Sequence, residues 1–372
     1  MRVMLVCAFD TYFDRVRMLL KYYEMKKCDV MVVTSDFSHR HKERRKYDWV
    51  DIHIKVRPYA KNLSMDRLRS HQEFSKKVQT LAELKRPDLI HALVPPNSLV
   101  KQLALYKQKH RSTKLIFDVI DLWPETMPVS HIDWMPPIQM WQNQRAQYID
   151  QADLIFTECD YYQEVLEKQN DPKVKTLYWA RKEKPVPYTQ TNRDAIHYCY
   201  LGSINNIIDT DCIANVLKET MRYRKTVLHI IGNGEMKDRL LQKAKDTGAE
   251  VIDHKELYDP SAKQMVFDQC HYGLNIMKPS VVVGLTMKSL DYLCAGLPLI
   301  NTIGGDTQTL CRQYDIGWNL TADNCAETIE AICRESLDEW QQKRNQAQKV
   351  YQMYFTEASF FATLDKVGVC DD

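Results

Sequence analysis

The chain has 372 residues, of which 27% are charged and 44% hydrophobic, and its formal net charge is +2. These proportions are typical of a globular protein and exclude a disordered tail and a fibrous repeat. No stretch approaches the roughly 18 apolar residues of a membrane span, and Asp10 and Asp14 cut short the apolar start before it reaches the about 7–15 residues of a secretory signal. We therefore expect a cytoplasmic protein.

The small net charge conceals an asymmetry between the two halves of the chain. Residues 1–186 contain 32 Lys and Arg against 24 Asp and Glu, whereas residues 187–372 contain 19 against 25. Such an imbalance predicts that the first half meets an anionic partner. A chance spread of surface charge is the alternative.

The cysteines indicate a reducing compartment. There are 11 of them, they form no C-x-x-C pair, and several lie in apolar runs, as Cys7, Cys199 and Cys294 do. A reduced cysteine in such a run behaves as a small hydrophobic residue. We therefore expect neither a zinc site nor a disulfide framework.

In the first half, short apolar runs alternate with longer segments whose apolar residues recur at helical spacing. The runs lack a polar break, which is typical of parallel strands covered on both faces. We predict strands at 3–8, 30–34, 52–56, 89–93, 115–120 and 154–157, and helices at 15–25, 66–84, 98–109 and 138–150.

The segment 179–194 contains Pro185, Pro187 and many polar residues, and it is predicted to be a linker. The alternation then restarts, which predicts two doubly wound α/β domains with a cleft between them. In open parallel sheets, ligands bind beyond the carboxyl ends of the strands. The second set has strands at 197–201, 227–231, 250–252, 272–277 and 299–301, and helices at 209–223, 236–246, 286–295 and from 336 onward.

Two glycine-containing loops follow strands of the second half. Gly202 and Ser203 precede a helix, so the backbone there could cradle a diphosphate or could form an ordinary turn. Asn233 and Gly234 belong to a Gly-Asn-Gly sequence that is either a tight turn or a ligand loop. This sequence is not a dinucleotide fingerprint, because Lys237 stands where the third glycine would be.

The run 283–300 is the most informative stretch. Gly284 opens a helix that Thr286 would cap, and Lys288 falls in the first turn, where the helix dipole favours an anion. Asp291, one turn later, could accept hydrogen bonds from ribose hydroxyls. An amphipathic helix with a solvated lysine and aspartate is the alternative.

In the first half, Asp121, Trp123 and Glu125 follow a predicted strand. Carboxylates beside a tryptophan suit a sugar, through hydroxyl recognition and stacking, and one of them could act as a general base. The alternative is a proline-containing loop in which the aspartates cap a turn.

Arg67 and His71 stand four residues apart near the start of a predicted helix, so they share one face. A structural histidine is the alternative there. The basic stretch 39–46, together with Lys107, Lys109, His110 and Arg111, has few interleaved aromatic residues, which disfavours a nucleic-acid partner. Anionic headgroups or a diphosphate-lipid fit this stretch better, although each single charge could simply be solvated.

Three motifs occur together and in a characteristic order: Asp-Leu-Trp-Pro-Glu at 121–125, Gly-Asn-Gly at 232–234, and Lys-Ser-x-Asp-Tyr-Leu-x-Ala-Gly-x-Pro-x-Ile at 288–300. Over nearly its whole length the chain thereby resembles bacterial glycosyltransferases of the GT-B fold, in the retaining family GT4. Within that family it is most similar to enzymes of capsule, exopolysaccharide or cell-wall polysaccharide assembly.

The resemblance implies an α/β protein with two Rossmann-like, doubly wound domains that face a central cleft. Residues 1–180 would bind the acceptor, residues 181–350 would bind the nucleotide-sugar, and residues 351–372 would form a C-terminal helix that packs back on the first domain. The chain departs from the family pattern in several places: Val283 and Asp291 stand where the family has two glutamates, and Ile120 replaces a histidine. No arginine follows Gly202 closely, so Lys288 would be the main cation for the diphosphate.

The resemblance also implies roles for individual residues. Asp121 and Lys288 would be catalytic, and the acceptor would meet Arg67, His71, Asp121, Trp123 and Glu125. The donor would meet Gly202, Ser203, Asn233, Gly234, Gly284, Leu285, Thr286, Lys288, Ser289 and Asp291.

The implied reaction moves a hexose, with retention, from a UDP-sugar to a glycan acceptor linked to a lipid diphosphate, at the inner face of the membrane. Lys288 and a helix N-terminus would take the place of a metal, so no cofactor is expected. Two alternatives are a sugar-nucleotide epimerase of the same fold and a degenerate, transferase-like partner subunit.

Overall fold

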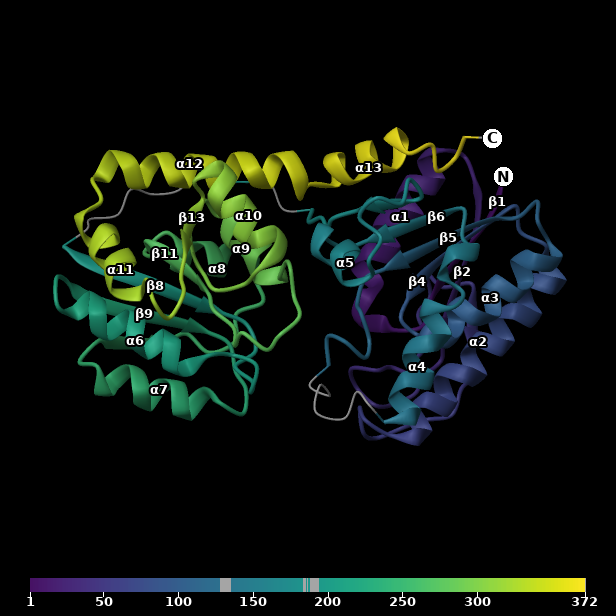
Figure 1. The fold of residues 1–372 in the computed structure, drawn as a ribbon, viewed down its shortest axis with the longest axis horizontal. Helices are drawn as coiled ribbons and strands as arrows, with labels where there is room; N and C mark the ends of the chain where they lie inside the picture. The colour runs from purple at the N-terminus through teal and green to yellow at the C-terminus, as the bar shows by residue number, and fades with distance from the viewer. Residues whose placement is uncertain (128–134, 183–184, 186, 188–193, 372) are drawn as a thin grey trace. The chain divides into compact units, whose positions relative to one another are not determined.

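The computed structural model describes residues 1–127, 135–182, 185, 187 and 194–371 (Figure 1). The chain divides into two compact units, the first formed by Met1–Trp179 together with the residues from Phe361 onward, and the second by Ala180–Phe360. Most of the predicted linker at 179–194 lies outside the described residues.

The first unit is built on seven parallel strands in the order β3-β2-β1-β4-β5-β6-β7. Its central strand β4 is buried along its whole length, as expected for a sheet covered on both faces. The strands are β1 (Arg2–Cys7), β2 (Asp29–Ser35), β3 (Ile52–Ile54), β4 (Leu89–Val94), β5 (Lys114–Val119), β6 (Leu154–Thr157) and β7 (Val174–Thr176).

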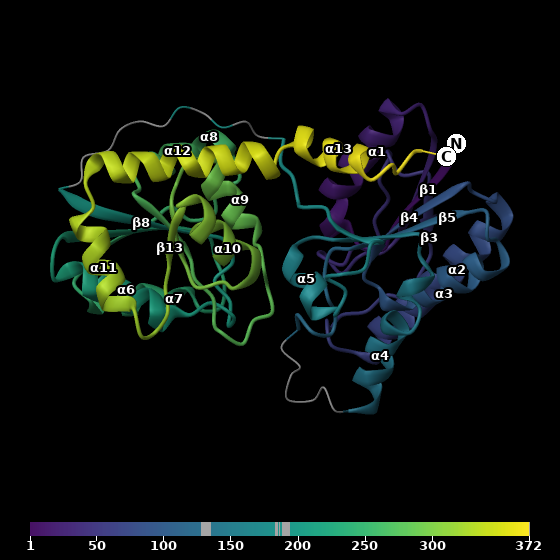
Figure 2. The same ribbon diagram turned by 45° about the horizontal axis from the view of Figure 1, so that its top comes forward.

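Helices cover both faces of this sheet (Figure 2). One face carries α1 (Phe13–Met25) and α5 (Asp160–Val165), and the other carries α2 (Met65–Lys85), α3 (Asn97–Lys109) and α4 (Pro136–Ala146). Two short 3-10 turns, η1 (Asp10–Tyr12) and η2 (Ile149–Gln151), complete the described elements of the unit.

The second unit repeats the plan with six parallel strands in the order β10-β9-β8-β11-β12-β13. The strands are β8 (Ala195–Leu201), β9 (Lys225–Ile231), β10 (Glu250–Asp253), β11 (Tyr272–Asn275), β12 (Leu299–Asn301) and β13 (Gly317–Asn319). The helices are α6 (Thr210–Met221), α7 (Lys237–Asp246), α8 (Pro260–Phe267), α9 (Met287–Cys294), α10 (Gly305–Tyr314), α11 (Cys325–Arg334) and α12 (Leu337–Tyr354). Both units therefore confirm the predicted doubly wound parallel arrangement.

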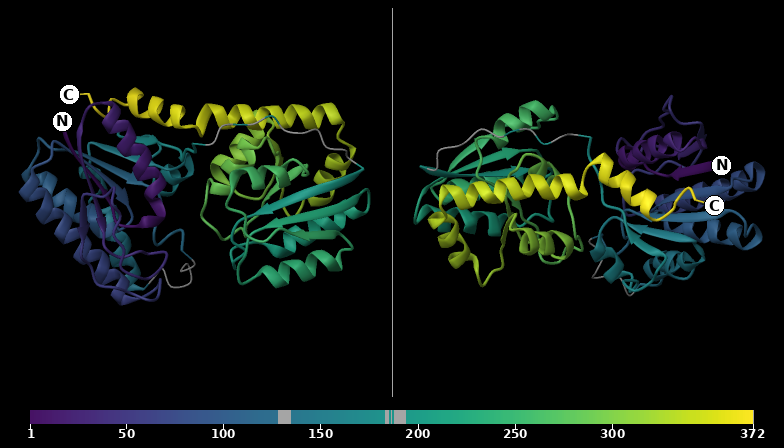
Figure 3. Two further views of the ribbon diagram at one scale, coloured as in Figure 1. Left: turned by 180° about the vertical axis from the view of Figure 1, so that it is seen from behind. Right: turned by 90° about the horizontal axis from the view of Figure 1, so that it is seen from above.

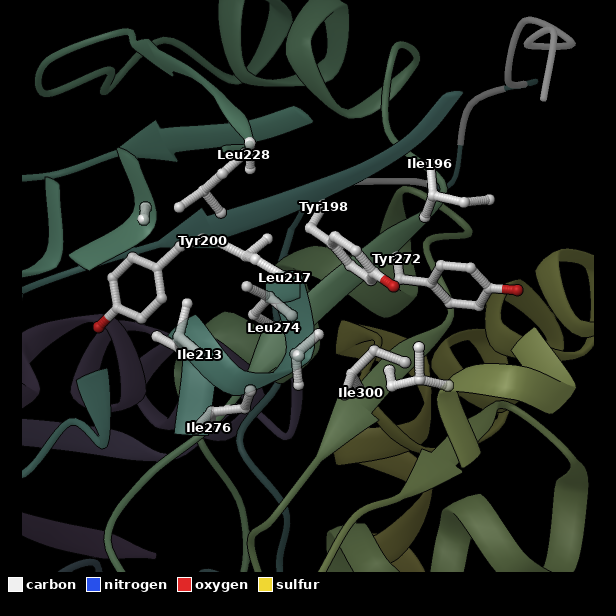
Figure 4. Close-up of a cluster of buried hydrophobic side chains, with 14 of the residues drawn as sticks. Ile196, Tyr198, Tyr200, Ile213, Leu217, Leu228, Tyr272, Leu274, Ile276 and Ile300 are labelled. Atoms are coloured by element: carbon white, nitrogen blue, oxygen red, sulfur yellow. The ribbon is translucent and has the colours of Figure 1, made fainter. Parts of the chain in front are cut away.

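Helices α6, α7 and α11 lie on one face of the second sheet, and α9, α10 and α12 lie on the other (Figure 3). Alternate strand residues such as Tyr198, Leu228 and Leu274 pack against Ile213 and Leu217 of α6 (Figure 4). These side chains are completely buried. The burial of this apolar area holds the helix on the sheet, so that the loops after the strands are fixed in place.

On the face of this sheet away from that core, three histidines stand side by side on neighbouring strands. The ring of His229 in β9 lies between His197 of β8 and His254 just after β10, with a ring nitrogen 3.0 Å from each neighbour. Burial lowers the pKa of all three, and that of His229 to about 4. The row is therefore held together by neutral imidazoles.

The C-terminal segment belongs to both units. Helix α12 is part of the second unit, and its Arg344 donates a hydrogen bond of 2.8 Å to the carbonyl of Gly296. The end of α13 (Glu357–Lys366) lies beside α1 (Figure 2), where the Tyr22 hydroxyl donates to Asp365 at 2.8 Å. The return to the first unit begins at Phe361 instead of residue 351. The reason is that the residues before it pack in the second unit.

Among the described helices, none combines the length and the apolar character that crossing a bilayer would require.

Candidate functional site

Each unit gathers polar side chains in the loops that follow its parallel strands, which is where ligands bind in such sheets. In the first unit these loops follow β1, β2, β4, β5 and β6. In the second unit they follow β8, β9, β11 and β12.

The loop after β5 is anchored by its own backbone and by one acid. The carbonyl of Trp123 accepts hydrogen bonds from the buried amide of Asn97 (2.7 Å) and from Arg145 (3.0 Å). Arg145 of α4 also forms an ion pair with Glu125. Glu125 therefore fastens the loop to α4, and its carboxylate is already partnered within the unit.

Asp121 occupies the beginning of the same loop and remains partly exposed. Its carboxylate accepts hydrogen bonds from the hydroxyl of Thr126 and from that of Tyr12, the latter at 3.3 Å. Burial raises the pKa of Asp121 above its usual range. A carboxylate with these properties can act as a base toward a hydroxyl group.

A second carboxyl group, Glu158, follows β6 directly, next to this loop. Strands β5 and β6 are aligned with Val119 opposite Thr157, and the Glu158 amide donates to the Val119 carbonyl at 3.1 Å. Burial and the negative charge of Asp121 raise the pKa of Glu158 to about 8. Glu158 therefore carries a proton at neutral pH beside the Asp121 carboxylate. Sequence reasoning missed it, although an acid at the carboxyl end of a predicted strand was a usable signal.

Trp179 contacts Glu158, and its indole N–H donates a hydrogen bond to the Glu158 carboxyl oxygen. The ring centre of Trp179 lies 5.4 Å from the guanidinium of Arg15. Arg15 forms a bidentate ion pair with Asp118, both contacts being 2.7 Å. Burial raises the pKa of Asp118, but Arg15 and His91 outweigh it and bring the value down to about 2. This pair is part of the core that positions Glu158.

Arg67 and His71 lie one turn apart at the start of α2, which Ser64 caps by accepting from the Arg67 amide at 3.2 Å. The Arg67 guanidinium is 3.9 Å from the ring centre of Trp123, and the His71 ring stacks on the same indole at 6.1 Å. The structure therefore brings together Arg67, His71 and Trp123, three of the predicted acceptor residues.

In the second unit, the loops after β8 and β9 pack backbone against backbone. The Ile204 amide donates to the Asn233 carbonyl at 2.9 Å. A Cβ on Gly232 would lie 2.0 Å from the Gly202 carbonyl oxygen, and one on Gly234 would lie 2.3 Å from that of Ile204. Gly232 and Gly234 thus serve this close packing, which is the turn interpretation of the Gly-Asn-Gly sequence.

Gly202 differs from these two glycines. Its φ is +116°, and a Cβ there would meet no atom of the described residues within 4 Å. Ser203 and Asn233 are exposed beside it, although the Asn233 side chain accepts from the Gly234 amide at 2.9 Å. Backbone at Gly202 is therefore open to close approach by a ligand.

Helix α9 begins as predicted, with Thr286 accepting from the Ser289 amide at 3.3 Å. The Thr286 and Ser289 hydroxyls are 2.7 Å apart, and Thr286 also donates to Asn275. The Gly284 carbonyl accepts from the amide of Thr307, and Leu285 is buried. The predicted donor residues Gly284 to Ser289 therefore form one rigid turn.

Lys288 in the first turn of α9 is buried, and its ammonium lies 4.7 Å from the ring centre of Tyr200. Within the described part of the chain it forms no ion pair. Burial lowers the pKa of Lys288 to about 7. A bound anion would relieve this burial penalty, because it would favour the charged ammonium.

Asp291 lies one turn farther along α9. It forms ion pairs with Arg181 at 3.5 Å and with Lys263 of α8 at 3.7 Å. The three side chains line a cavity of about 360 Å³. Sequence reasoning missed Arg181 and Lys263, because they stand far from Asp291 in the chain and α8 was not predicted.

In the ranges that the structure describes, no group of three or more His, Cys, Asp or Glu is arranged to hold a metal ion.

Comparison with known proteins gives matches to solved structures alone. No protein-family model matches the chain, and no curated sequence matches it. The apo form of the lipopolysaccharide outer core galactosyltransferase WaaB is 12% identical with a TM-score of 0.68, over 98% of both chains. HepE of Anabaena, in complex with UDP and glucose, is 13% identical with a TM-score of 0.67, over 99% of both chains. Sucrose-phosphate synthase of Thermosynechococcus elongatus is 11% identical with a TM-score of 0.67, over 98% of both chains. At these identities the likeness establishes the fold, which is the predicted GT-B fold.

Proposed function

We propose that this chain is a retaining glycosyltransferase of the GT4 type that moves a hexose from a UDP-sugar to a glycan acceptor. The observation that carries the proposal is Lys288, a buried ammonium without a carboxylate partner among the described residues, at the start of α9. The names of the matching structures support it, since WaaB is a galactosyltransferase and HepE was solved with UDP and glucose.

On the donor side, Lys288 and the N-terminus of α9 would stabilise the negative charge that develops on the leaving diphosphate. Gly202 gives that group room to approach the backbone. Asp291 would accept hydrogen bonds from the ribose hydroxyls. Because the chain itself supplies this positive charge, we propose that turnover needs no divalent metal.

On the acceptor side, Asp121 would take the proton of the attacking hydroxyl, and the buried Trp123 would hold Arg67 and His71 in place beside it. Glu158, which is protonated beside Asp121, is a positioning residue for that carboxylate. In a front-face reaction the hydroxyl approaches from the side on which the nucleoside diphosphate leaves. The main task of the protein is then to position the reactants and to stabilise charge.

The acceptor that we propose is a glycan linked to a lipid diphosphate, in the synthesis of a surface polysaccharide at the inner face of the cell membrane. The excess of 32 Lys and Arg over 24 Asp and Glu in residues 1–186 supports contact with such an anionic surface.

A transfer assay tests the proposal. The protein is incubated with radiolabelled UDP-hexoses and a bacterial membrane extract, with and without excess EDTA. We expect label in the lipid fraction, in equal amounts with and without EDTA. Isomerised donor would identify an epimerase instead, and no reaction would leave a partner subunit. Activity lost in EDTA and restored by magnesium would contradict the metal-independent mechanism.

A further inference from the structure

We infer that the first unit binds an anionic group of the acceptor, a phosphoryl or carboxylate group, on the guanidinium of Arg67 with His71 beside it. The inference rests on the proposed function and specifies the chemistry of the acceptor. Nothing in the donor site enters it.

Arg67 is a buried cation that lacks an anion. Only 2% of the residue is exposed; its guanidinium donates to the carbonyl of Asn62 at 2.7 Å, lies 3.9 Å from the ring centre of Trp123 and neighbours the Tyr59 hydroxyl. The Nε atom and the second terminal nitrogen are buried without a partner among the described residues. Removing a guanidinium from water is costly unless its donors are satisfied. An anion bound to the two free donors would satisfy them in the fork geometry that arginine favours.

His71 presents the same deficiency one helical turn away. It is 4% exposed, and neither ring nitrogen has a hydrogen-bond partner in the described chain. Burial and the positive charge of Arg67 hold the pKa of His71 well below its usual range. Two neighbouring polar side chains therefore lack partners at a single place, which indicates that a ligand is missing there.

The other groups around Arg67 do not supply the missing charge. His39 contacts the Tyr59 hydroxyl at 2.6 Å, and Lys42, whose pKa is lowered by burial and by Arg67, donates to Asn62. The nearby acids are already occupied by other donors. Asp10 accepts from the His39 amide at 3.1 Å, and Asp121 accepts from Thr126 and Tyr12.

On the His71 side of the cluster, a cavity of about 490 Å³ lies between α2, α3 and α4. His71 lines this cavity together with Ser98, Gln72 and Trp141. The amides and hydroxyls there can hydrogen-bond sugar hydroxyls, while the indole offers an apolar face. The cavity thus fits an anionic sugar better than a bare ion.

The direct test is calorimetric titration of the full chain with glucose 1-phosphate, glucuronate, inorganic phosphate and neutral glucose. We expect glucose 1-phosphate or glucuronate to bind at least tenfold more tightly than glucose. We expect Arg67→Gln to remove that preference and Arg312→Gln, at an exposed arginine of the second unit, to keep it. Equal binding of charged and neutral sugars, or an unchanged preference in Arg67→Gln, would overturn the inference.

Proton uptake gives a second readout that a merely structural role would not move. Because the bound anion raises the pKa of His71, binding at pH 7 should take up a proton, seen as a buffer-dependent heat. His71→Gln should abolish this uptake, and absence of uptake in the unaltered protein would count against the site. Should Arg67→Gln fail to fold, Arg67→Lys keeps the charge without the fork and is expected to weaken binding.

Two further arms identify the source of the anion and separate this inference from the proposed function. Arg67-dependent binding to phosphatidylglycerol vesicles, without binding of the soluble sugars, would assign the anion to a lipid headgroup. Binding of inorganic phosphate alone would assign it to the free ion and overturn the acceptor role. UDP titration should be the same in Arg67→Gln and in the unaltered protein. If the unaltered protein does not bind UDP, the proposed donor site is refuted. The test of anion binding at Arg67 does not depend on that result.

Discussion

The two units arrange their candidate ligand-binding groups in different ways. The second unit uses backbone and one helix start, with Gly202 open and Lys288 as the cation. The first unit uses side chains from several distant segments, among them Arg67, Asp121 and Glu158. The backbone-built site depends on local sequence, whereas the side-chain site depends on the packing of the whole sheet.

The largest effect is expected at the cation of the second unit. Lys288→Ala should lower turnover about 10²–10³-fold, because charge on the leaving group loses its stabilisation. Steady-state kinetics with a UDP-hexose and UDP titration measure this loss. Lys245→Ala, at an exposed lysine of the same unit, is the control and should behave as the unaltered protein. Equal turnover in the Lys288→Ala and Lys245→Ala variants would contradict the role of Lys288 as the cation of the second unit.

Asp121 and Glu158 of the first unit should determine how turnover depends on pH. Asp121→Asn should lower turnover about 10²-fold through loss of the base. With a pKa of about 8, Glu158 loses its proton as the pH rises, so activity should fall on the alkaline side. Glu158→Gln, which cannot titrate, should remove that fall, whereas Glu164→Gln, at an exposed acid, should keep it. An alkaline limb retained in Glu158→Gln would refute the positioning role.

The third prediction concerns stability of the backbone-built site. Gly232→Ala places a Cβ 2.0 Å from the Gly202 carbonyl oxygen at a φ of +149°. We expect about 2–4 kcal/mol of lost unfolding free energy, measured by urea denaturation. Gly304→Ala, where a Cβ meets no described atom within 4 Å, should change stability little. A tolerated Gly232→Ala would show that the loops can separate.

The smallest expected effect is a loss of stability at acidic pH, and residues of both units contribute to it. Burial lowers the pKa of His39 and of His229 to about 4, against an ordinary value of 6.5. The unfolded chain thus binds more protons between these values, so stability is full above pH 6.5 and falls as the pH drops toward 4. The urea midpoint should be lower at pH 5 than at pH 7.5. His229→Gln should reduce the difference, and His41→Gln, at an exposed histidine, should leave it unchanged.

Elements with a continuous apolar pattern were predictable from the sequence, even where they are short. The strands at Leu154–Thr157 and Leu299–Asn301 fall within their predicted bounds, because each is a continuous apolar run before a polar loop. The missed elements include α11, a regular ten-residue helix, as well as short or atypical ones. Strands β7 and β13 have three residues each, and α10 begins at a Gly-Gly pair that resembles a turn.

Prediction of the site followed the same division. The turn from Gly284 to Ser289 was found because its glycine, cap and lysine are consecutive in the chain. Glu158 and Lys263 were missed, since their importance arises from neighbours that only the folded sheet supplies. The ion pair of Glu125 was also missed, because its partner Arg145 comes from a helix beyond the loop.

The shared C-terminal segment has a consequence for synthesis of the protein on the ribosome. Asp365 accepts a hydrogen bond from Tyr22 and forms an ion pair with Lys26 at 2.7 Å. The packing of the first unit is therefore completed by residues that are translated after the second unit. The whole of the second unit is translated between these partners. The N-terminal half must therefore wait, with one side of α1 uncovered, until the second unit has emerged. Completion of the two units is thus coupled in time, even though each has its own core.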